Sequence, residues 1–328
     1  MKEIIIKEND ANQRLDKFLT KSFKNLPKSL MYKAIRKKYI KINKKRCLPN
    51  DILKINDVVS LYIKDELLQN NEFNQYDFLK APSKVDIVYE DKNILLVNKK
   101  PGLLSHPDET YHFDSLISRV QHYLYDKGEF EPNCENSFTP ALANRIDRNT
   151  GGIVIVAKNA ASLRILNNKI KHREIKKFYL CIVCGTFDKK QGTLSAYLEK
   201  NESQNRVYVS SSPTKNSKTI KTKYTVIDEC RHFSLLDVEL LTGRTHQIRA
   251  HMAYVGHPLL GDGKYGKNAQ NKRFGYKYQA LYSYKLKFCF ETPTSSLDYL
   301  NGKTFVAPKV WFVDDFYKSL SSYKNIRS

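Results

Sequence analysis

From residue 85 onward, apolar positions alternate with polar ones or form short continuous runs, and both patterns are typical of β-strands. A helix is indicated where Asn159 can cap a segment with Leu163, Leu166 and Ile170 on one face. Strands that follow one another with few intervening helices favour an antiparallel or mixed sheet. We therefore predict an α+β domain around a mixed, largely antiparallel β-sheet, with strands at residues 85–89, 94–98, 178–184, 193–198, 206–210, 219–228, 233–240 and 280–290.

The first 64 residues follow a different pattern, in which two short helices precede two short strands at residues 39–43 and 58–63. Each helix has one apolar face, formed by Leu15, Phe18 and Leu19 in the first and by Met31, Ala34 and Ile35 in the second. Ser29 is the expected cap of the second helix. This segment holds 17 Lys and Arg against 6 Asp and Glu, which is half of the chain's excess positive charge. We predict a separate basic module here.

Residues 65–84 are polar, rich in Asn and Gln, and end at Ala-Pro-Ser, a composition typical of a linker. The predicted organisation is therefore a basic module at residues 1–64, a linker at 65–84 and a larger body at 85–328. Because linkers of this kind are crossed by few contacts, we expect the body to fold without the module.

The net charge of +22 predicts a polyanionic partner, either nucleic acid or an anionic membrane. No apolar run approaches the ~18 to 20 residues that a membrane-spanning helix needs. The first ten residues contain too short an apolar run for a signal peptide. We therefore expect a cytoplasmic protein whose partner is a nucleic acid and not a membrane.

Cysteine and histidine spacings give no support to a metal site. The six cysteines are scattered, as expected for reduced thiols in the cytosol. Cys181 and Cys184 have CxxC spacing, but in a strand these positions point to opposite faces. His246, His251 and His257 lie five and six residues apart, which matches no helical ligand pair. No metal is predicted, and the absence of Gly-rich nucleotide motifs argues against a nucleotide cofactor.

Residues 144–152, with the sequence NRIDRNTGG, place one carboxylate between two arginines on a turn that enters the apolar run 153–156. The run is expected to be a buried strand, and the two glycines allow positive φ or a close approach of the backbone to a ligand. Asp147 should then occupy a rigid rim. Taken alone, the pattern fits equally a turn aspartate paired with a neighbouring arginine at the surface.

A second motif covers residues 241–252, with the sequence LTGRTHQIRAHM. Thr245 is the expected cap of a helix whose apolar positions face the core, which leaves Arg249 free to reach a partner. By itself the motif fits either a phosphate-binding helix start or a basic surface helix. Arg244 and His246, at its beginning, are candidate RNA contacts.

Together these segments resemble the RluA-type ribosomal RNA pseudouridine synthases over nearly the whole chain. The resemblance rests on four motifs in the order and spacing of that family, at residues 99–107, 145–152, 176–185 and 242–262. The basic module similarly resembles the alpha-L RNA-binding domain first recognised in a small-subunit ribosomal protein. One departure is Asn144, which stands where the family generally has His.

The resemblance implies that Asp147 is the catalytic aspartate, Tyr179 the active-site tyrosine, and Arg249 the arginine that pairs with the aspartate. It further implies that Arg145 takes the place of the flipped-out uridine, since a base inside a helix cannot be reached until it is extruded. The alpha-L domain would present three basic residues to RNA phosphates, namely Arg36, Lys37 and Lys38.

The implied reaction breaks the nitrogen glycosidic bond of uridine, rotates the uracil and joins its carbon 5 to the ribose. A carboxylate can attack the sugar carbon or remove the 2′ proton, and the sequence fits both routes. No cofactor is required. The implied partner is RNA, with 23S ribosomal RNA favoured over transfer RNA, and we expect a monomer.

Two other classes of protein are compatible with the charge. A catalytically silent RNA-binding or ribosome-assembly protein would leave Asp147 and Tyr179 without a purpose, because an acid at such a place repels phosphates. A nuclease would normally show a cluster of metal-binding carboxylates or a histidine pair, and neither is apparent in the sequence.

Overall fold

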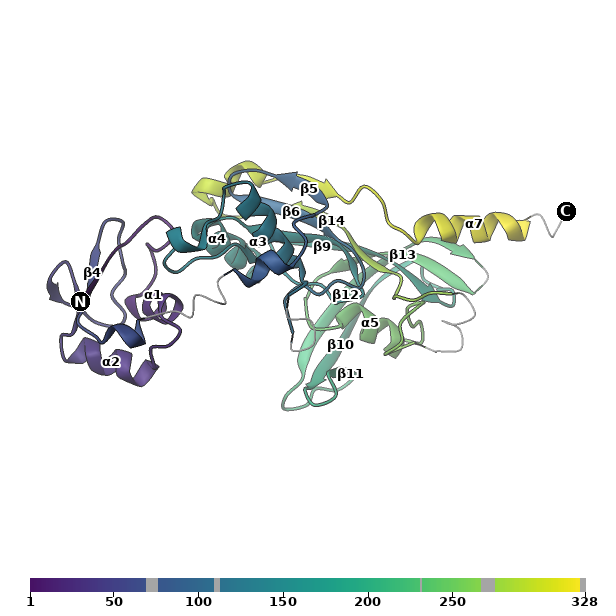
Figure 1. The fold of residues 1–328 in the computed structure, drawn as a ribbon. Helices are drawn as coiled ribbons and strands as arrows, with labels where there is room; N and C mark the ends of the chain where they lie inside the picture. Colours follow the sequence, from purple (N-terminus) through teal and green to yellow (C-terminus); the bar gives the residue numbers. More distant parts are fainter. Residues whose placement is uncertain (69–75, 109–112, 231, 267–274, 325–328) are drawn as a thin grey trace.

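The structure, a computed structural model, describes residues 1–68, 76–108, 113–230, 232–266 and 275–324. The molecule is elongated, with a small N-terminal module at one end, a large sheet in the middle and helix α7 (Val313–Lys324) at the other end (Figure 1). Among the helices in these ranges, none combines the length and apolar character needed to cross a membrane.

The N-terminal module contains an antiparallel sheet in the order β1 (Lys2–Ile5), β4 (Val58–Leu61), β2 (Ile40–Ile42) and β3 (Lys45–Arg46). Helices α1 (Leu15–Ser22) and α2 (Lys28–Arg36) pack on it, and the six apolar residues expected on their inner faces are buried in one core. The predicted cap is wrong. Pro27 precedes α2 and Ser29 lies inside it, because the fixed φ of proline suits a helix start.

The segment between module and body contributes to both cores. It forms short 3₁₀ helices η1 (Asp65–Leu67) and η3 (Asp77–Lys80). Leu68 is buried in the core of the module, and Phe78 is buried in a core of the larger body. A polar composition therefore did not make this segment an unpacked linker, since its few apolar residues anchor both of its described ends.

Hydrogen bonds also join the module directly to the larger body. Asp10 is fully buried at this junction and accepts hydrogen bonds from Asn136 Nδ2 (2.7 Å) and Ser137 Oγ (2.6 Å). The side chain of Asn9 accepts a bond from the backbone N–H of Ala160 (3.0 Å). A small set of polar contacts therefore joins the two parts, and the predicted domain boundaries stay predictions.

The larger body is built on one sheet in the order β11-β10-β12-β13-β9-β14-β8-β6-β5, with β15 beside β14 and β7 beside β8. Only the β8–β14 pair is parallel, so the sheet is mixed and largely antiparallel, which confirms the predicted α+β fold. Its strands are β5 (Ile87–Glu90), β6 (Ile94–Lys99), β7 (Ala141–Leu142), β8 (Gly151–Ala157), β9 (Ile175–Cys184), β10 (Gln191–Asn201), β11 (Arg206–Ser210), β12 (Lys218–Cys230), β13 (Phe233–Leu240), β14 (Leu281–Phe288) and β15 (Thr304–Val306).

Alternate residues of the central strands enter two cores on opposite faces of this sheet. One core includes α3 (Leu116–Asp126) and α5 (Gln247–Tyr254), and the other includes α4 (Ala160–Lys171) and the 3₁₀ helix η5 (Ser295–Leu300). Asn159 caps α4 by accepting from Ser162 N, as predicted, whereas the sequence pattern did not reveal α3. A short 3₁₀ helix, η4 (Pro132–Cys134), precedes β7.

Two glycines let β8 and β14 come together below the Asp147 turn. Gly152 has φ +118°, and a Cβ atom there would lie 2.2 Å from the carbonyl oxygen of Ser283. A Cβ on Gly151 would lie 2.4 Å from the Tyr282 ring. A side chain at Gly152 would meet the backbone of β14 and force the strands apart. The positive φ that the glycine pair was expected to allow is present at Gly152.

No disulfide joins the six cysteines, all of which lie in the described ranges. Cys181 is buried in one core while Cys184 is partly exposed, as expected for strand positions that face opposite ways. Among the described residues, no group of three or more His, Cys, Asp or Glu side chains is arranged to hold a metal ion.

Candidate active site

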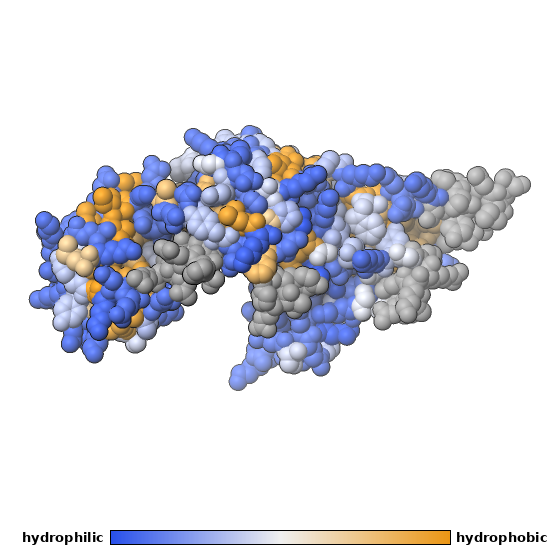
Figure 2. All heavy atoms as spheres, viewed as in Figure 1, coloured by the Kyte–Doolittle hydropathy of each residue, from blue (hydrophilic) through white to orange (hydrophobic). Residues whose placement is uncertain are grey.

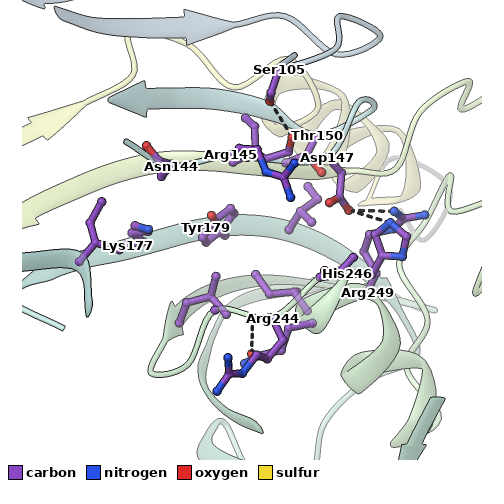
Figure 3. Close-up of a pocket in the computed structure, with 18 of the residues that line it drawn as sticks. Ser105, Asn144, Arg145, Asp147, Thr150, Lys177, Tyr179, Arg244, His246 and Arg249 are labelled. Atoms are coloured by element: carbon purple, nitrogen blue, oxygen red, sulfur yellow. Dashed lines mark hydrogen bonds and ion pairs between the residues drawn. The ribbon is translucent and has the colours of Figure 1, made fainter. Parts of the chain in front are cut away.

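A pocket of ≈ 740 Å³ opens where three segments of the larger body meet. The turn at residues 144–150, the first half of β9, and the loop that leads into α5 all line it. Figure 3 shows Asp147, His246 and Arg249 converging at one end of this pocket, with Tyr179 farther along β9. Residues more than 100 positions apart in the sequence therefore share one site.

Hydrogen bonds hold the Asp147 turn from both sides. Ser105 Oγ donates to the Ile146 carbonyl (3.0 Å), and the backbone N–H of Gly102 donates to the Arg148 carbonyl (2.9 Å). At the end of the turn, Gln279 Nε2 donates to Thr150 Oγ1 (3.1 Å). The aspartate is thus mounted on backbone that is fixed on either side of it.

Lys99 also braces this turn, a role that the sequence reading missed. Its buried ammonium donates to the carbonyls of Leu103 (2.7 Å), Arg148 (2.9 Å) and Lys100 (3.1 Å). Burial lowers the pKa of Lys99 to about 7, and Asp147 opposes this shift. The three carbonyl acceptors match the three donors of a protonated lysine, so the charged form fits the site.

Arg249 pairs with Asp147, as the resemblance implied, but it grips a second carboxylate more fully. Its Nη1 donates to Asp147 Oδ2 (2.8 Å), while Nε and Nη2 donate to the two oxygens of Asp262 (2.7 and 3.0 Å). Arg249 therefore contacts Asp147 through one hydrogen bond only, because the fork of the guanidinium faces Asp262. Burial disfavours the Arg249 charge, yet the two carboxylates hold its pKa above the ordinary value.

The sequence analysis assigned no role to Asp262, the second carboxylate that Arg249 contacts. Its side chain is 0 % exposed, and Oδ1 also accepts the backbone N–H groups of Lys264 (2.9 Å) and Tyr265 (3.1 Å). Burial opposes ionisation of Asp262, but Arg249 and these N–H groups keep its pKa below the ordinary value. The signal was present as the last residue of the 242–262 motif, an acid directly after glycine, but nothing local linked it to Arg249.

His246 lies next to Asp147 without forming a short ion pair. Its Nε2 is 3.9 Å from Asp147 Oδ2, and burial lowers the pKa of His246 despite the nearby carboxylate. The Tyr265 hydroxyl accepts from Val207 N (3.0 Å) and forms a hydrogen bond of 2.9 Å with His246 Nδ1, which holds the imidazole in place beside the aspartate.

The chain takes the left-handed conformation at His246, with φ 52°, immediately before α5 begins at Gln247. No side chain caps this helix, so the prediction of Thr245 as its cap is wrong. Because the sharp bend at His246 delays the helix start, Thr245 falls too early to reach the free N–H groups of the first turn. Ile248 and Met252 are buried as expected.

Tyr179 is buried in the pocket wall with 6 % of its surface exposed. Burial raises the pKa of Tyr179 to about 12, a hydrogen bond with Ser283 opposes the rise, and Asp147 adds to it. The hydroxyl is therefore protonated at neutral pH. The remaining pocket candidates, Arg145 and Arg244, are exposed and line the opening.

Arg36, Lys37 and Lys38 lie in the N-terminal module, at the end of α2 and just beyond it. All three are exposed, and none lines the pocket. Figure 2 shows that hydrophilic residues dominate this face of the molecule, which is hollowed between the module and the β10–β11 hairpin. The structure thus separates the predicted RNA contacts into two groups on different parts of the molecule.

Asn144, which departs from the resembled family, has a structural role. Its buried Oδ1 accepts the backbone N–H of Ile155 (2.8 Å) in the neighbouring strand. The side chain therefore ties the start of the turn to β8, and the substitution leaves the pocket's ionisable groups in place.

Comparison with known families gives two matches. Residues 93–254 match the RNA pseudouridylate synthase family, and residues 13–59 match the S4 domain. The first range contains the turn with Asp147, all of β9 and Arg249, whereas Asp262 lies beyond it. The second range covers both helices of the N-terminal module.

Known proteins are similar over most of the chain. An RNA pseudouridine synthase of Mycoplasma capricolum subsp. capricolum is 35% identical, covering 95% of this chain and 99% of the relative. Ribosomal large subunit pseudouridine synthase C of Vibrio cholerae is 31% identical, covering 90% and 91%. The solved structure of human RNA pseudouridylate synthase domain containing 4 superposes with a TM-score of 0.56 at 18% identity, covering 75% of this chain and 97% of that chain.

Proposed function

Because the chain belongs to the RNA pseudouridylate synthase family, and is thus an RNA-modifying isomerase, we propose that it converts specific uridines of 23S ribosomal RNA to pseudouridine with Asp147 as its catalytic aspartate. The choice of large-subunit RNA is supported by the name of the Vibrio cholerae relative. We also propose that it acts as a monomer in the cytoplasm.

The observation that carries the proposal is the position of Asp147. It is one quarter exposed at the pocket rim, on a turn fixed by hydrogen bonds on both sides, and Arg249 holds one of its oxygens at 2.8 Å. The other oxygen is thereby left available to a ribose. Arg249 also places a positive charge beside the carboxylate.

Tyr179 offers the uracil a flat surface and a proton. With a pKa of about 12 the hydroxyl is neutral, so it acts as a hydrogen-bond donor or as a relay for the carbon-5 proton, and a phenolate base is disfavoured. The reaction breaks the bond between the uracil nitrogen and the ribose, rotates the uracil, and joins its carbon 5 to the ribose by the new carbon–carbon bond. The buried wall around Tyr179 limits water, which would otherwise hydrolyse the detached sugar.

The two groups of cations fit an RNA substrate that is held at two places. Arg145 lies on the same turn as Asp147, close to the place from which a base would be extruded, and can occupy the gap left in the RNA stack. The S4 domain binds the phosphate backbone through Arg36, Lys37 and Lys38. This second contact lies outside the pocket, so it supplies affinity and not chemistry.

The test is Asp147→Asn, which keeps the shape of the side chain and removes its charge. We expect pseudouridine formation to be lost while RNA affinity is largely kept, measured by tritium release from carbon-5-labelled uridine RNA and by filter binding. Asp114→Asn is a matched control, because Asp114 is a half-exposed surface acid paired with Arg119. Turnover by Asp147→Asn comparable to that of the control would refute the assignment.

The substrate is tested separately by mapping pseudouridine in cells that lack the protein. Carbodiimide treatment followed by reverse transcription marks each pseudouridine, and mass alone cannot because the reaction is an isomerisation. We expect the loss of one or more marks from 23S ribosomal RNA that the wild-type gene restores and the Asp147→Asn gene does not. A loss confined to transfer RNA would change the proposed substrate and leave the chemistry standing.

A further inference from the structure

Three cations gather in the pocket away from Asp147. Arg173 follows α4 and takes the left-handed conformation with φ 66°, Lys177 lies on β9 two residues before Tyr179, and Arg244 lies in the loop before α5. All three line the pocket. Figure 3 shows Lys177 on the far side of Tyr179 from the pair of Asp147 and Arg249, and Arg244 below Tyr179 in this view.

These cations are close enough to repel one another. Arg173 Nη1 would lie 3.5 Å from a Cβ on Gly243, which places its guanidinium beside the residue that precedes Arg244. Burial and the neighbouring Arg244 lower the pKa of Arg173. Burial and the neighbouring Arg173 lower the pKa of Lys177 to about 8. Each member of the group therefore destabilises the charge of the next.

No carboxylate offsets this repulsion within the described residues. Arg249, by contrast, also lines the pocket but is paired with two carboxylates. Glu239 also lines the pocket, but it is paired in register with Phe178, so its side chain shares the sheet face of Phe178 and not that of Lys177. Its carboxylate is 3.7 Å from Lys223.

We propose that Arg173, Lys177 and Arg244 form a subsite for one phosphodiester group of the RNA, next to the target uridine. A phosphate provides the negative charge that no carboxylate in the described part of the chain supplies to these three cations. The N–H groups of an arginine guanidinium match the oxygens of the phosphate. The subsite lies beyond Tyr179, so the phosphate is held while the base is processed at Asp147. The identity of the ligand as RNA rests on the function proposed above.

The first test measures the pKa of Lys177 and does not depend on catalysis. The full-length protein is labelled with ¹³C-lysine, the Lys177 resonance is identified by its loss in Lys177→Arg, and its pKa is measured in inorganic phosphate and in chloride at equal ionic strength. We expect phosphate to raise the pKa of Lys177 from about 8. In Arg173→Gln the pKa should already be higher in chloride, and the phosphate effect should shrink. Identical titrations in the two salts would overturn the subsite.

The second test uses 23S ribosomal RNA. Arg173→Gln should weaken binding and lower the slope of log affinity against log salt concentration by up to ~0.9, as expected for one lost phosphate contact. Arg119→Gln is the matched control, since Arg119 is a surface arginine paired with Asp114 outside the pocket. An equal slope in both variants would overturn the subsite. Failure of the wild type to form pseudouridine, with the phosphate response of Lys177 intact, would instead remove the proposed function.

Discussion

Replacing Arg249 with lysine separates its two bonds, because the carboxylates that it holds are unequally buried. Asp262 is 0 % exposed, whereas the Asp147 side chain is 25 % exposed. An ammonium is a point charge and cannot reproduce the three-point grip of the guanidinium. Leaving the charge of Asp262 unpaired costs more than releasing that of Asp147, which water can reach. We therefore expect the lysine of Arg249→Lys to stay with Asp262 and to release Asp147.

The expected size of the effect follows from the single bond that is lost at Asp147. A hydrogen bond to a charged group contributes about 1.5–3 kcal/mol. If that bond holds the carboxylate in its reactive position, turnover should fall about 10- to 150-fold, at 1.36 kcal/mol for each factor of ten. The free energy of unfolding should also fall, since a single ammonium group replaces the two N–H donors of Arg249 that contact Asp262.

The assay is single-turnover tritium release at saturating RNA, combined with filter binding at several salt concentrations. Arg119→Lys serves as control for the general effect of this replacement at an exposed ion pair. We expect Arg249→Lys to lower the rate constant much more than the affinity. Full turnover with weaker, more salt-sensitive binding would show that Arg249 is a phosphate contact and that its pairing with Asp147 is irrelevant to the reaction.

Three further predictions concern other parts of the molecule. Tyr179→Phe should bind RNA but stall after base detachment, and because burial raises the pKa of Tyr179 to about 12, a fall in wild-type activity between pH 8 and 10 should come from other groups such as Lys177 and should persist in the residual activity of Tyr179→Phe; a fall near pH 10 that Tyr179→Phe removes would contradict this. Burial lowers the pKa of His251 to about 4, so stability present above pH 6.5 should be lost as pH falls toward 4, by up to about 3 kcal/mol. Urea unfolding at pH 7.5 and 4.5 should show a smaller difference for His251→Gln, and an equal difference would count against the assignment. Deleting residues 1–64 should make the salt dependence of RNA binding shallower, and an unchanged slope would mean that the module does not contact RNA.

The sequence alone determined most of the elements and the family. The predicted bounds of strands β11 and β13 match the structure to the residue. In β11 apolar and polar positions alternate because Val207 faces a core and Tyr208 faces outward. The glycine pair before residues 153–156 indicated backbone with positive φ, which Gly152 has, and four ordered motifs indicated the family. Local patterns succeeded wherever the physical cause was itself local.

Only the tertiary structure decided which groups share the site, because their contacts join distant segments. Asp262 meets Arg249 across 13 residues, and Arg249 meets Asp147 across 102, so no spacing could show that the guanidinium fork faces Asp262. The same holds for Lys99, whose acceptors include a carbonyl 49 residues away, and for the junction at Asp10, whose partners lie more than 120 residues along the chain. A buried charged side chain pairs with whichever group the fold places beside it. The sequence shows the charged residue but not its partner.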